Sequence, residues 1–369
     1  MTQALLLNIA AAINLLTVQQ VPDTIQGDFP PYSEVEVVFQ NGQVTLAGTL
    51  TMPDGSGRHP AVVMVTGSGA QNRDQEVFGF KPFRMIADHL SRNGIAVLRY
   101  DDRGVGGSSG ELSQSTTEDF AEDVIAAVEF LKTLSAIDEG NIGVVGHSEG
   151  GLVAPLAASR SEAISFIVML AGPALRGEEI LRAQTQLINE AEGKPASITA
   201  QELFVLSEVA SAVKDDTGWD ALRDTLVSIM ETRIANADFP TPRGSDVRSF
   251  IMQQVDAQLQ TYRSPWFRFF LIYEPEEALE ALRIPVLALF GELDLQVPPH
   301  LNAPAMEAAL ERSRSPSHLV TVIPGVNHLF LPATNGSPRE YATIPKEFEP
   351  QFLDLMTTWI LAHIQKFEP

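Results

Sequence analysis

Residues 142–156 read IGVVGHSEGGLVAPL. The first four residues form a short continuous apolar run, which is typical of a strand buried on both faces of a parallel sheet. Leu152 and Leu156, one helical turn apart after the glycines, predict a helix. A G-x-S-x-G string alone arises by chance in about one chain in ten of this size at ordinary glycine usage. The strand–turn–helix setting is therefore what makes Ser148 a candidate nucleophile.

The predicted turn around Ser148 explains its glycines. A sharp turn between a strand and a helix is strained and needs positions without side chains, and Gly146, Gly150 and Gly151 meet that need. Such a turn lifts the serine oxygen above the edge of the sheet. The N-terminus of the following helix then faces negative charge that develops on a substrate.

Short apolar runs recur along the chain and predict the rest of the sheet. They lie at residues 61–65, 95–100, 142–145, 164–170, 286–290 and 319–323. Helical patterns lie between them, such as Phe83, Ile86 and Leu90 on one face. We place a capping box at Ser115 and Glu118, at the start of a second helix. This alternation predicts an α/β architecture with a mostly parallel sheet.

An antiparallel entry to this sheet is predicted near the N-terminus. Residues 34–39 and 44–52 alternate or are β-rich, and Asn41-Gly42 between them is a strong hairpin signal.

The domain organisation follows from an interval without strand patterns. Residues 176–282 contain several amphipathic helical stretches, and strand-like sequence resumes at Val286. We interpret residues 176–282 as a helical cap inserted into a catalytic domain of residues 32–175 and 283–369, an independent helical domain being the alternative. Residues 1–31 are a lead-in whose apolar part, residues 4–18, has no preceding Lys or Arg. A degenerate signal peptide and a surface helix fit it equally, so cytoplasmic and periplasmic locations both stay open.

Composition excludes several classes of function. The chain has 369 residues, 44% of them hydrophobic, with 47 acidic against 25 basic residues and a formal net charge of −22. Nucleic-acid binding needs a basic surface, so we expect no nucleic-acid partner. The absence of cysteine excludes disulfides, thiolate metal sites and cysteine nucleophiles. We expect no membrane span, and the sequence does not indicate an oligomeric state.

A serine nucleophile needs a base, which is itself oriented by an acid. His328 lies on a predicted turn just after the last buried strand, so it is the candidate base. Asp294 follows the preceding strand and is the candidate acid, with Glu292 and Glu178 as competitors. The order Ser, Asp, His is the one that strand–turn–helix serine sites use.

An oxyanion hole needs two backbone N–H donors. We expect one from Glu149, directly after the nucleophile. The other should come from the glycine loop at residues 66–69, with Ser68 as the first candidate and Gly69 as the next, although a purely structural glycine turn remains an alternative. The loop at residues 101–108 fails the dinucleotide-binding pattern at its third glycine position, which is Ser109, so we assign it a structural role.

Several motifs together resemble one family. They are TGSG at 66–69, NRD at 72–74, RYDDRG at 99–104, GHSEGG at 146–151, SPWF at 264–267, the segment 291–298 and NH at 327–328. In combination they resemble the bacterial α/β-hydrolases grouped with EstD-type carboxylesterases and serine aminopeptidase-like hydrolases.

The resemblance implies an α/β-hydrolase fold, with a mostly parallel eight-stranded sheet and a helical cap between strands six and seven. It also implies no cofactor, hydrolysis of short-chain acyl esters, and Ser148, Asp294 and His328 as a catalytic triad. The glycine loop begins with Thr66 and contains no His-Gly-Gly-Gly string, which argues against the hormone-sensitive-lipase branch.

Three functions stay open at this point. The leading hypothesis is a small-molecule ester hydrolase that works through an acyl-enzyme, with Trp266 and Phe267 lining an apolar pocket if they are not plain packing residues. The second is a serine aminopeptidase or amidase, in which Glu178 or Glu179 binds a substrate amine. The third is a non-catalytic binding protein built on the same fold.

Overall fold

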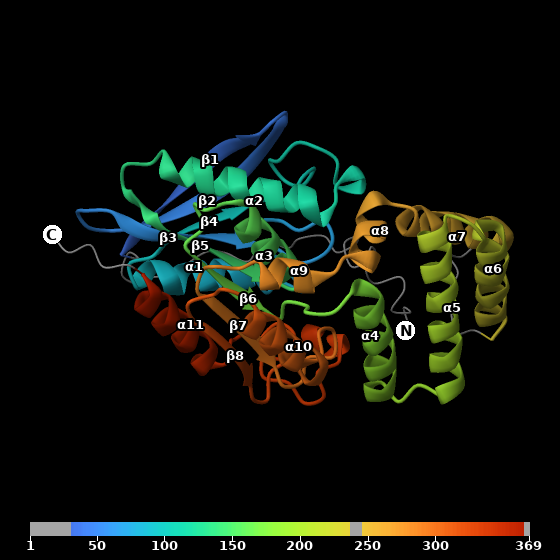
Figure 1. The fold of residues 1–369 in the computed structure, drawn as a ribbon. Helices are drawn as coiled ribbons and strands as arrows, with labels where there is room; N and C mark the ends of the chain where they lie inside the picture. Colours follow the sequence, from blue (N-terminus) through green and yellow to red (C-terminus); the bar gives the residue numbers. More distant parts are fainter. Residues whose placement is uncertain (1–30, 237–245, 365–369) are drawn as a thin grey trace. The chain divides into compact units, whose positions relative to one another are not determined.

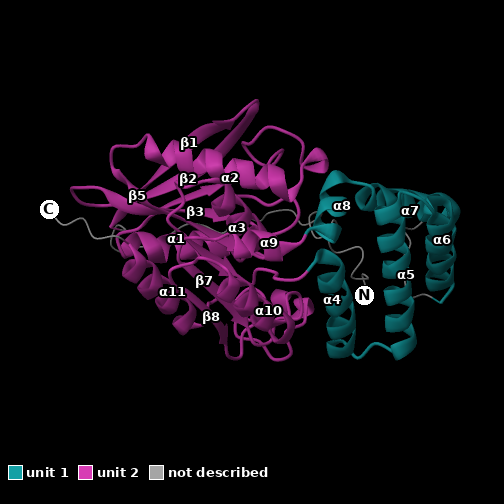
Figure 2. Ribbon diagram, in the orientation of Figure 1, with its two compact units in different colours: residues 1–15, 176–273 teal, residues 16–175, 274–369 magenta. Residues whose placement is uncertain are grey.

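The computed structural model describes residues 31–236 and 246–364. The predicted signal or surface helix, within residues 1–30, lies outside them. The chain divides into two compact units, a sheet unit that includes residues 31–175 and 274–364, and a helical unit made of the described residues from 176 to 273 (Figure 2).

Among the described residues, eight strands form one sheet in the order β1-β2-β4-β3-β5-β6-β7-β8 (Figure 1). The first two are joined by the predicted Asn41-Gly42 hairpin, and β2 runs antiparallel to β4, while all later neighbours are parallel. The predicted mostly parallel eight-stranded sheet is therefore confirmed. The strands are β1 Tyr32–Asn41, β2 Val44–Pro53, β3 His59–Val65, β4 Ala96–Tyr100, β5 Ile137–His147, β6 Phe166–Leu170, β7 Val286–Gly291 and β8 His318–Ile323.

Helices pack on both faces of the sheet because its central strands are apolar on both sides. Val62 and Met64 of β3 belong to a core cluster with α1 and α11, whereas the alternate residues Val63 and Val65 are buried on the opposite face. The helices of this unit are α1 Pro82–Arg92, α2 Thr117–Lys132, α3 Gly150–Arg160, α9 Pro275–Glu280, α10 Pro299–Arg312 and α11 Pro350–His363, with 3₁₀ turns η2 Leu112–Gln114 and η3 Pro338–Ala342.

The helical unit lies between β6 and β7 in chain order. It consists of α4 Gly177–Ala191, α5 Ala196–Asp215, α6 Trp219–Ala235, α7 Val247–Tyr262 and α8 Pro265–Ile272. It ends at Tyr273 rather than at the expected residue 282, because α9 packs against α3 and α10 of the sheet unit. That these helices cap the site stays a prediction.

The capping box of α2 differs from the predicted one by one residue. Thr116 is the N-cap, and its backbone N–H donates to Asp119 Oδ2 at 2.8 Å. Ser115 instead donates its hydroxyl to the carbonyl oxygen of Glu111 at 2.9 Å, within the preceding 3₁₀ turn. None of the helices in the described ranges combines the length and the apolar character that crossing a membrane requires.

Candidate active site

Ser148 occupies a strained turn between β5 and α3. Its φ angle is 55°, in the left-handed region that costs a residue with a side chain about 1 to 2 kcal/mol. The strained backbone is held by two hydrogen bonds of 2.8 Å, from Ser148 N–H to Leu170 O and from Gly151 N–H to Ser148 O. A Cβ on Gly150 would overlap the carbonyl oxygen of Val65, so only glycine fits there. Strain of this kind concentrates at functional sites.

His328 and Asp294 come together from two neighbouring strand ends. Asp294 follows β7, and His328 follows β8, so the parallel sheet brings both to one edge. His328 Nδ1 lies 2.7 Å from Asp294 Oδ2, and both side chains are buried. The other carboxylate oxygen, Oδ1, accepts backbone N–H groups of Gln296 at 2.7 Å and Val297 at 2.9 Å. A carboxylate fixed in this way keeps the imidazole proton on Nδ1 and leaves Nε2 as a base.

The competing acids have other partners. Glu292 accepts the backbone N–H of Gly325 at 2.8 Å, which ties together the segments that follow β7 and β8. Glu178 lies in the helical unit and forms an ion pair with Lys214. The structure therefore places Asp294, and neither competitor, on the imidazole of His328.

The glycine loop lies directly beside the nucleophile. A Cβ built on Gly67 would stand 3.1 Å from Ser148 Cβ. Ser68 and Gly69 are partly exposed, and Gln71 Nε2 donates to the carbonyl oxygen of Ser68 at 3.2 Å. The two candidate donor residues of the loop are therefore not fully buried. The roles of Ser68, Gly69 and the Glu149 N–H stay predictions.

Asp102 binds the first residue of the glycine loop and the segment just after the loop. Its carboxyl group accepts the Thr66 hydroxyl at 2.6 Å and the Gln71 N–H at 2.9 Å. Burial raises the pKa of Asp102 to about 8, and the nearby Glu149 carboxyl adds to the effect. The Glu149 side chain itself accepts the Thr117 hydroxyl at 2.8 Å.

Asp101, the neighbour of Asp102, binds Arg73 in the segment that follows the glycine loop. Its carboxylate accepts the backbone N–H of Arg73 at 2.9 Å and pairs with the Arg73 guanidinium at 2.8 Å. The structural role assigned to residues 101–108 agrees with these contacts.

Two residues at the site were not identified from the sequence as part of it. His147 is buried, its Nε2 lies 2.9 Å from the carbonyl oxygen of His328, and its Nδ1 lies 2.8 Å from Gln75 Nε2. Burial and the neighbouring His328 lower the pKa of His147 to about 3. In the sequence, His147 is the residue directly before Ser148. No spacing or periodicity marks Gln75, whose partner His147 lies 72 residues further along the chain.

The two aromatic residues proposed for the pocket both lie on α8 of the helical unit. Phe267 is buried there and packs against Tyr262, with ring centroids 5.2 Å apart. Trp266 is partly exposed and stacks on Phe270 at 5.6 Å. Of the two proposed residues, only Trp266 keeps exposed surface, and contact with a substrate stays a prediction for both.

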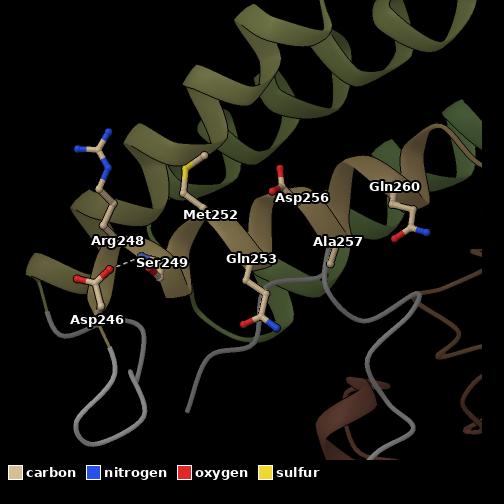
Figure 3. A pocket seen from close by; sticks show the side chains of 8 residues that line it. All are labelled: Asp246, Arg248, Ser249, Met252, Gln253, Asp256, Ala257 and Gln260. Atoms are coloured by element: carbon tan, nitrogen blue, oxygen red, sulfur yellow. Dashed lines mark hydrogen bonds between the residues drawn. The ribbon is translucent and has the colours of Figure 1, made fainter.

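A pocket of about 720 Å³ lies along α7 in the same unit (Figure 3). Most of its lining residues have polar side chains, and none of them is a predicted site residue: they are Asp246, Arg248, Ser249, Met252, Gln253, Asp256, Ala257 and Gln260.

Sequence comparisons show which known proteins the chain resembles. The family described as serine aminopeptidase, S33, matches residues 81–220, a range that includes Ser148. Esterase EstD of Thermotoga maritima is 36% identical over 172 residues, which are 47% of this chain and 40% of that protein. Thiohydrolase aneE of Aspergillus aculeatus is 33% identical over 173 residues, 46% of this chain and 51% of that protein. The chain thus spans about half or less of the length of these relatives.

Among solved structures, the Pyrococcus furiosus esterase PF2001 superposes with a TM-score of 0.53 at 16% identity, covering 93% of this chain and 96% of that one. At that identity the likeness concerns the fold alone. The strand order, the strained serine turn and this likeness together identify an α/β-hydrolase fold, and residues 81–220 match the serine aminopeptidase S33 family.

Proposed function

We propose that the protein is a serine carboxylic-ester hydrolase that acts through an acyl-enzyme. The observation that carries the proposal is the 2.7 Å contact between His328 Nδ1 and Asp294 Oδ2. The backbone of that same histidine is held at 2.9 Å by His147, the residue directly before Ser148. Serine turn, base and acid thus belong to one hydrogen-bonded group in the sheet unit.

Each residue has a defined role in this mechanism. His328 Nε2 takes the proton of the Ser148 hydroxyl as the serine oxygen attacks the ester carbonyl carbon. Asp294 stabilises the resulting imidazolium. The backbone N–H groups of Ser68 and Glu149 hold the oxyanion of the tetrahedral intermediate. His328 then donates the proton to the departing alcohol. In the second half of the reaction, His328 takes a proton from water as the water oxygen attacks the acyl carbon. His328 returns that proton to the Ser148 oxygen as the carboxylic acid leaves.

Short-chain acyl esters are the proposed substrate class. The name of the EstD relative is that of an esterase, which supports ester chemistry. The partly exposed Trp266 offers an apolar surface for an acyl chain. A coenzyme-A thioester is less suited, because its phosphates call for basic side chains and the chain has only 25 Lys and Arg against 47 acids.

The test is a series of p-nitrophenyl esters from acetyl to decanoyl, assayed with the wild type and Ser148→Ala. We expect turnover to be highest with the shortest chains and to disappear in Ser148→Ala. Ser159→Ala is the matched control, because Ser159 lies in α3, the helix that follows Ser148, and its hydroxyl donates to the carbonyl oxygen of Leu156. Turnover by Ser148→Ala at the wild-type rate would overturn the proposal.

A second candidate function is aminopeptidase or amidase activity, which the description of the matching family favours. The same triad cleaves amides, so the discriminating measurement is turnover of aminoacyl p-nitroanilides beside that of the esters. A higher kcat/KM for the anilides would replace the esterase proposal by the peptidase. If a fluorophosphonate probe failed to label Ser148, the protein would instead be a binding protein with a hydrolase fold.

A further inference from the structure

A chain of three hydrogen bonds joins the glycine loop to the backbone of His328. Gln75 Oε1 accepts the N–H of Gly67 at 2.9 Å, and Gln75 Nε2 lies 2.8 Å from His147 Nδ1. His147 Nε2 lies 2.9 Å from the carbonyl oxygen of His328. Both Gln75 and His147 are at least nine-tenths buried. We propose that Gln75 and His147 are positioning residues that hold the oxyanion loop and the catalytic base in register with each other.

The polarity of this chain is determined at both ends by the backbone. The N–H of Gly67 can only donate, so Gln75 must turn its oxygen towards it and its NH₂ group towards His147. The carbonyl of His328 can only accept, so His147 must carry its proton on Nε2. The two requirements agree, because Nδ1 is then the acceptor that the NH₂ group of Gln75 needs. A single neutral tautomer of His147 satisfies every bond.

The electrostatic environment supports this neutral tautomer. Burial and the nearby His328 lower the pKa of His147 to about 3, so the ring carries no charge near neutral pH. The two imidazole rings are 4.7 Å apart between centroids. A charge on His147 would oppose the imidazolium that His328 forms during the reaction. A neutral His147 can therefore hold the base without lowering its proton affinity through repulsion.

Gln75 has an unusual backbone conformation. Gln75 has a φ angle of 50°, in the left-handed region that residues with side chains avoid. At the other end of the bond, Gly67 packs beside Ser148, with a hypothetical Cβ 3.1 Å from Ser148 Cβ. A shift of Gly67 would therefore move the loop relative to the nucleophile, and a shift of His147 would move the base.

The inference rests on the proposed esterase function only for its kinetic test. Gln75→Met and His147→Phe replace each side chain by an apolar one of similar shape and remove the hydrogen bonds. We expect each to lower kcat by roughly 10- to 100-fold, the range that small displacements of reacting groups produce. KM for the short esters should stay within about twofold, because substrate binding is not the property that changes.

A conservative variant provides the rescue. His147→Gln keeps a side-chain NH₂ group near the position of Nε2, so it can still donate to the carbonyl of His328, and its kcat should exceed that of His147→Phe by roughly tenfold. The matched control is Ser91→Ala, which removes a buried hydrogen bond of 2.7 Å to Thr51 in the same unit, away from the site. That variant should lose stability and keep the wild-type kcat.

A spectroscopic measurement tests the inference without activity. Nitrogen-15 shifts of the ring of His147 in the wild-type protein, assigned with His147→Phe, should report a neutral ring protonated on Nε2 at neutral pH. A ring protonated on Nδ1, or a charged ring, would overturn the inference. So would wild-type kcat in both folded variants, Gln75→Met and His147→Phe. A wild type that is inactive on esters and unlabelled by fluorophosphonate would overturn only the esterase function, since the spectrum is read independently.

Discussion

Replacement of Asp294 by Asn tests how the structure fixes the catalytic base. In the wild type, Asp294 Oδ1 accepts two backbone N–H groups, from Gln296 and Val297, and Oδ2 faces His328 Nδ1 at 2.7 Å. The Asn oxygen must stay with the two backbone donors, so its NH₂ group takes the place of Oδ2. His328 Nδ1 then faces a donor and has to give up its proton, which moves to Nε2. The nitrogen that should accept the serine proton is thereby occupied.

The size of the effect follows from this change of tautomer. The same substitution in a Ser-His-Asp triad lowers kcat by about 10⁴-fold. At about 1.4 kcal/mol for each factor of ten, this is roughly 5 kcal/mol of lost transition-state stabilisation. Stability should suffer much less, since both backbone bonds to Oδ1 remain. We expect the free energy of unfolding to fall by about 1.5 to 3 kcal/mol, from the loss of one charge-assisted bond.

The assay combines p-nitrophenyl acetate turnover, fluorophosphonate labelling of Ser148 and urea unfolding. Asp138→Asn is the matched control, because Asp138 is also buried and also accepts two hydrogen bonds, from Asn141 at 2.6 Å and from Gly140 at 3.2 Å. It should keep the wild-type kcat. If Asp294→Asn retained more than about a tenth of the wild-type turnover, the assignment of Asp294 as the orienting acid would be refuted.

Two further predictions concern the glycine loop. Gly67→Ala would place a Cβ 3.1 Å from Ser148 Cβ, so kcat should fall roughly tenfold. The control is Gly140→Ala, whose Cβ meets its nearest neighbour at 3.6 Å and which should keep full activity. Equal kcat values in the two variants would contradict the close packing of Gly67 against Ser148. Burial raises the pKa of Asp102 to about 8, so between about pH 4 and pH 8 the folded state holds a proton that the unfolded state has lost, and stability declines as pH rises. Asp102→Asn removes that proton equilibrium. Between about pH 5 and about pH 8, the free energy of unfolding of the variant, measured in urea, should rise relative to that of the wild type by up to about 1.4 kcal/mol per pH unit. Parallel pH profiles of the two proteins would show that Asp102 is ionised throughout.

Local sequence signals predicted the strands well and the helix starts less well. The hairpin at Asn41-Gly42 is a local property of two residues, and the apolar runs coincide with the central strands. At the start of α2, however, two successive residues are suitable N-caps with an acid three positions later. Their local chemistry is the same, and the contact of Ser115 with Glu111 leaves Thr116 to cap the helix.

The C-terminal boundary of the helical unit was also not predicted correctly from local sequence. The helix α9, Pro275–Glu280, has no feature in its own sequence that separates it from the preceding helices. Its packing against α3 and α10 assigns it to the sheet unit. Arg312 of α10 also pairs with Glu276 and Glu280 of α9. Such contacts join segments far apart in the chain and leave no periodic pattern.

For this protein, the sequence by itself determined the α/β architecture, the serine turn and the order of the candidate nucleophile, acid and base. Those features depend on hydrophobic period and on position after a strand, which are readable locally. The tertiary structure alone decided that Asp294 rather than Glu292 contacts His328, and that Gln75 and His147 join the glycine loop to the base. The direction of a hydrogen bond depends on atoms that the fold brings together. His147 and His328, which share such a bond, are 181 positions apart in the chain. A local sequence pattern therefore cannot predict this contact.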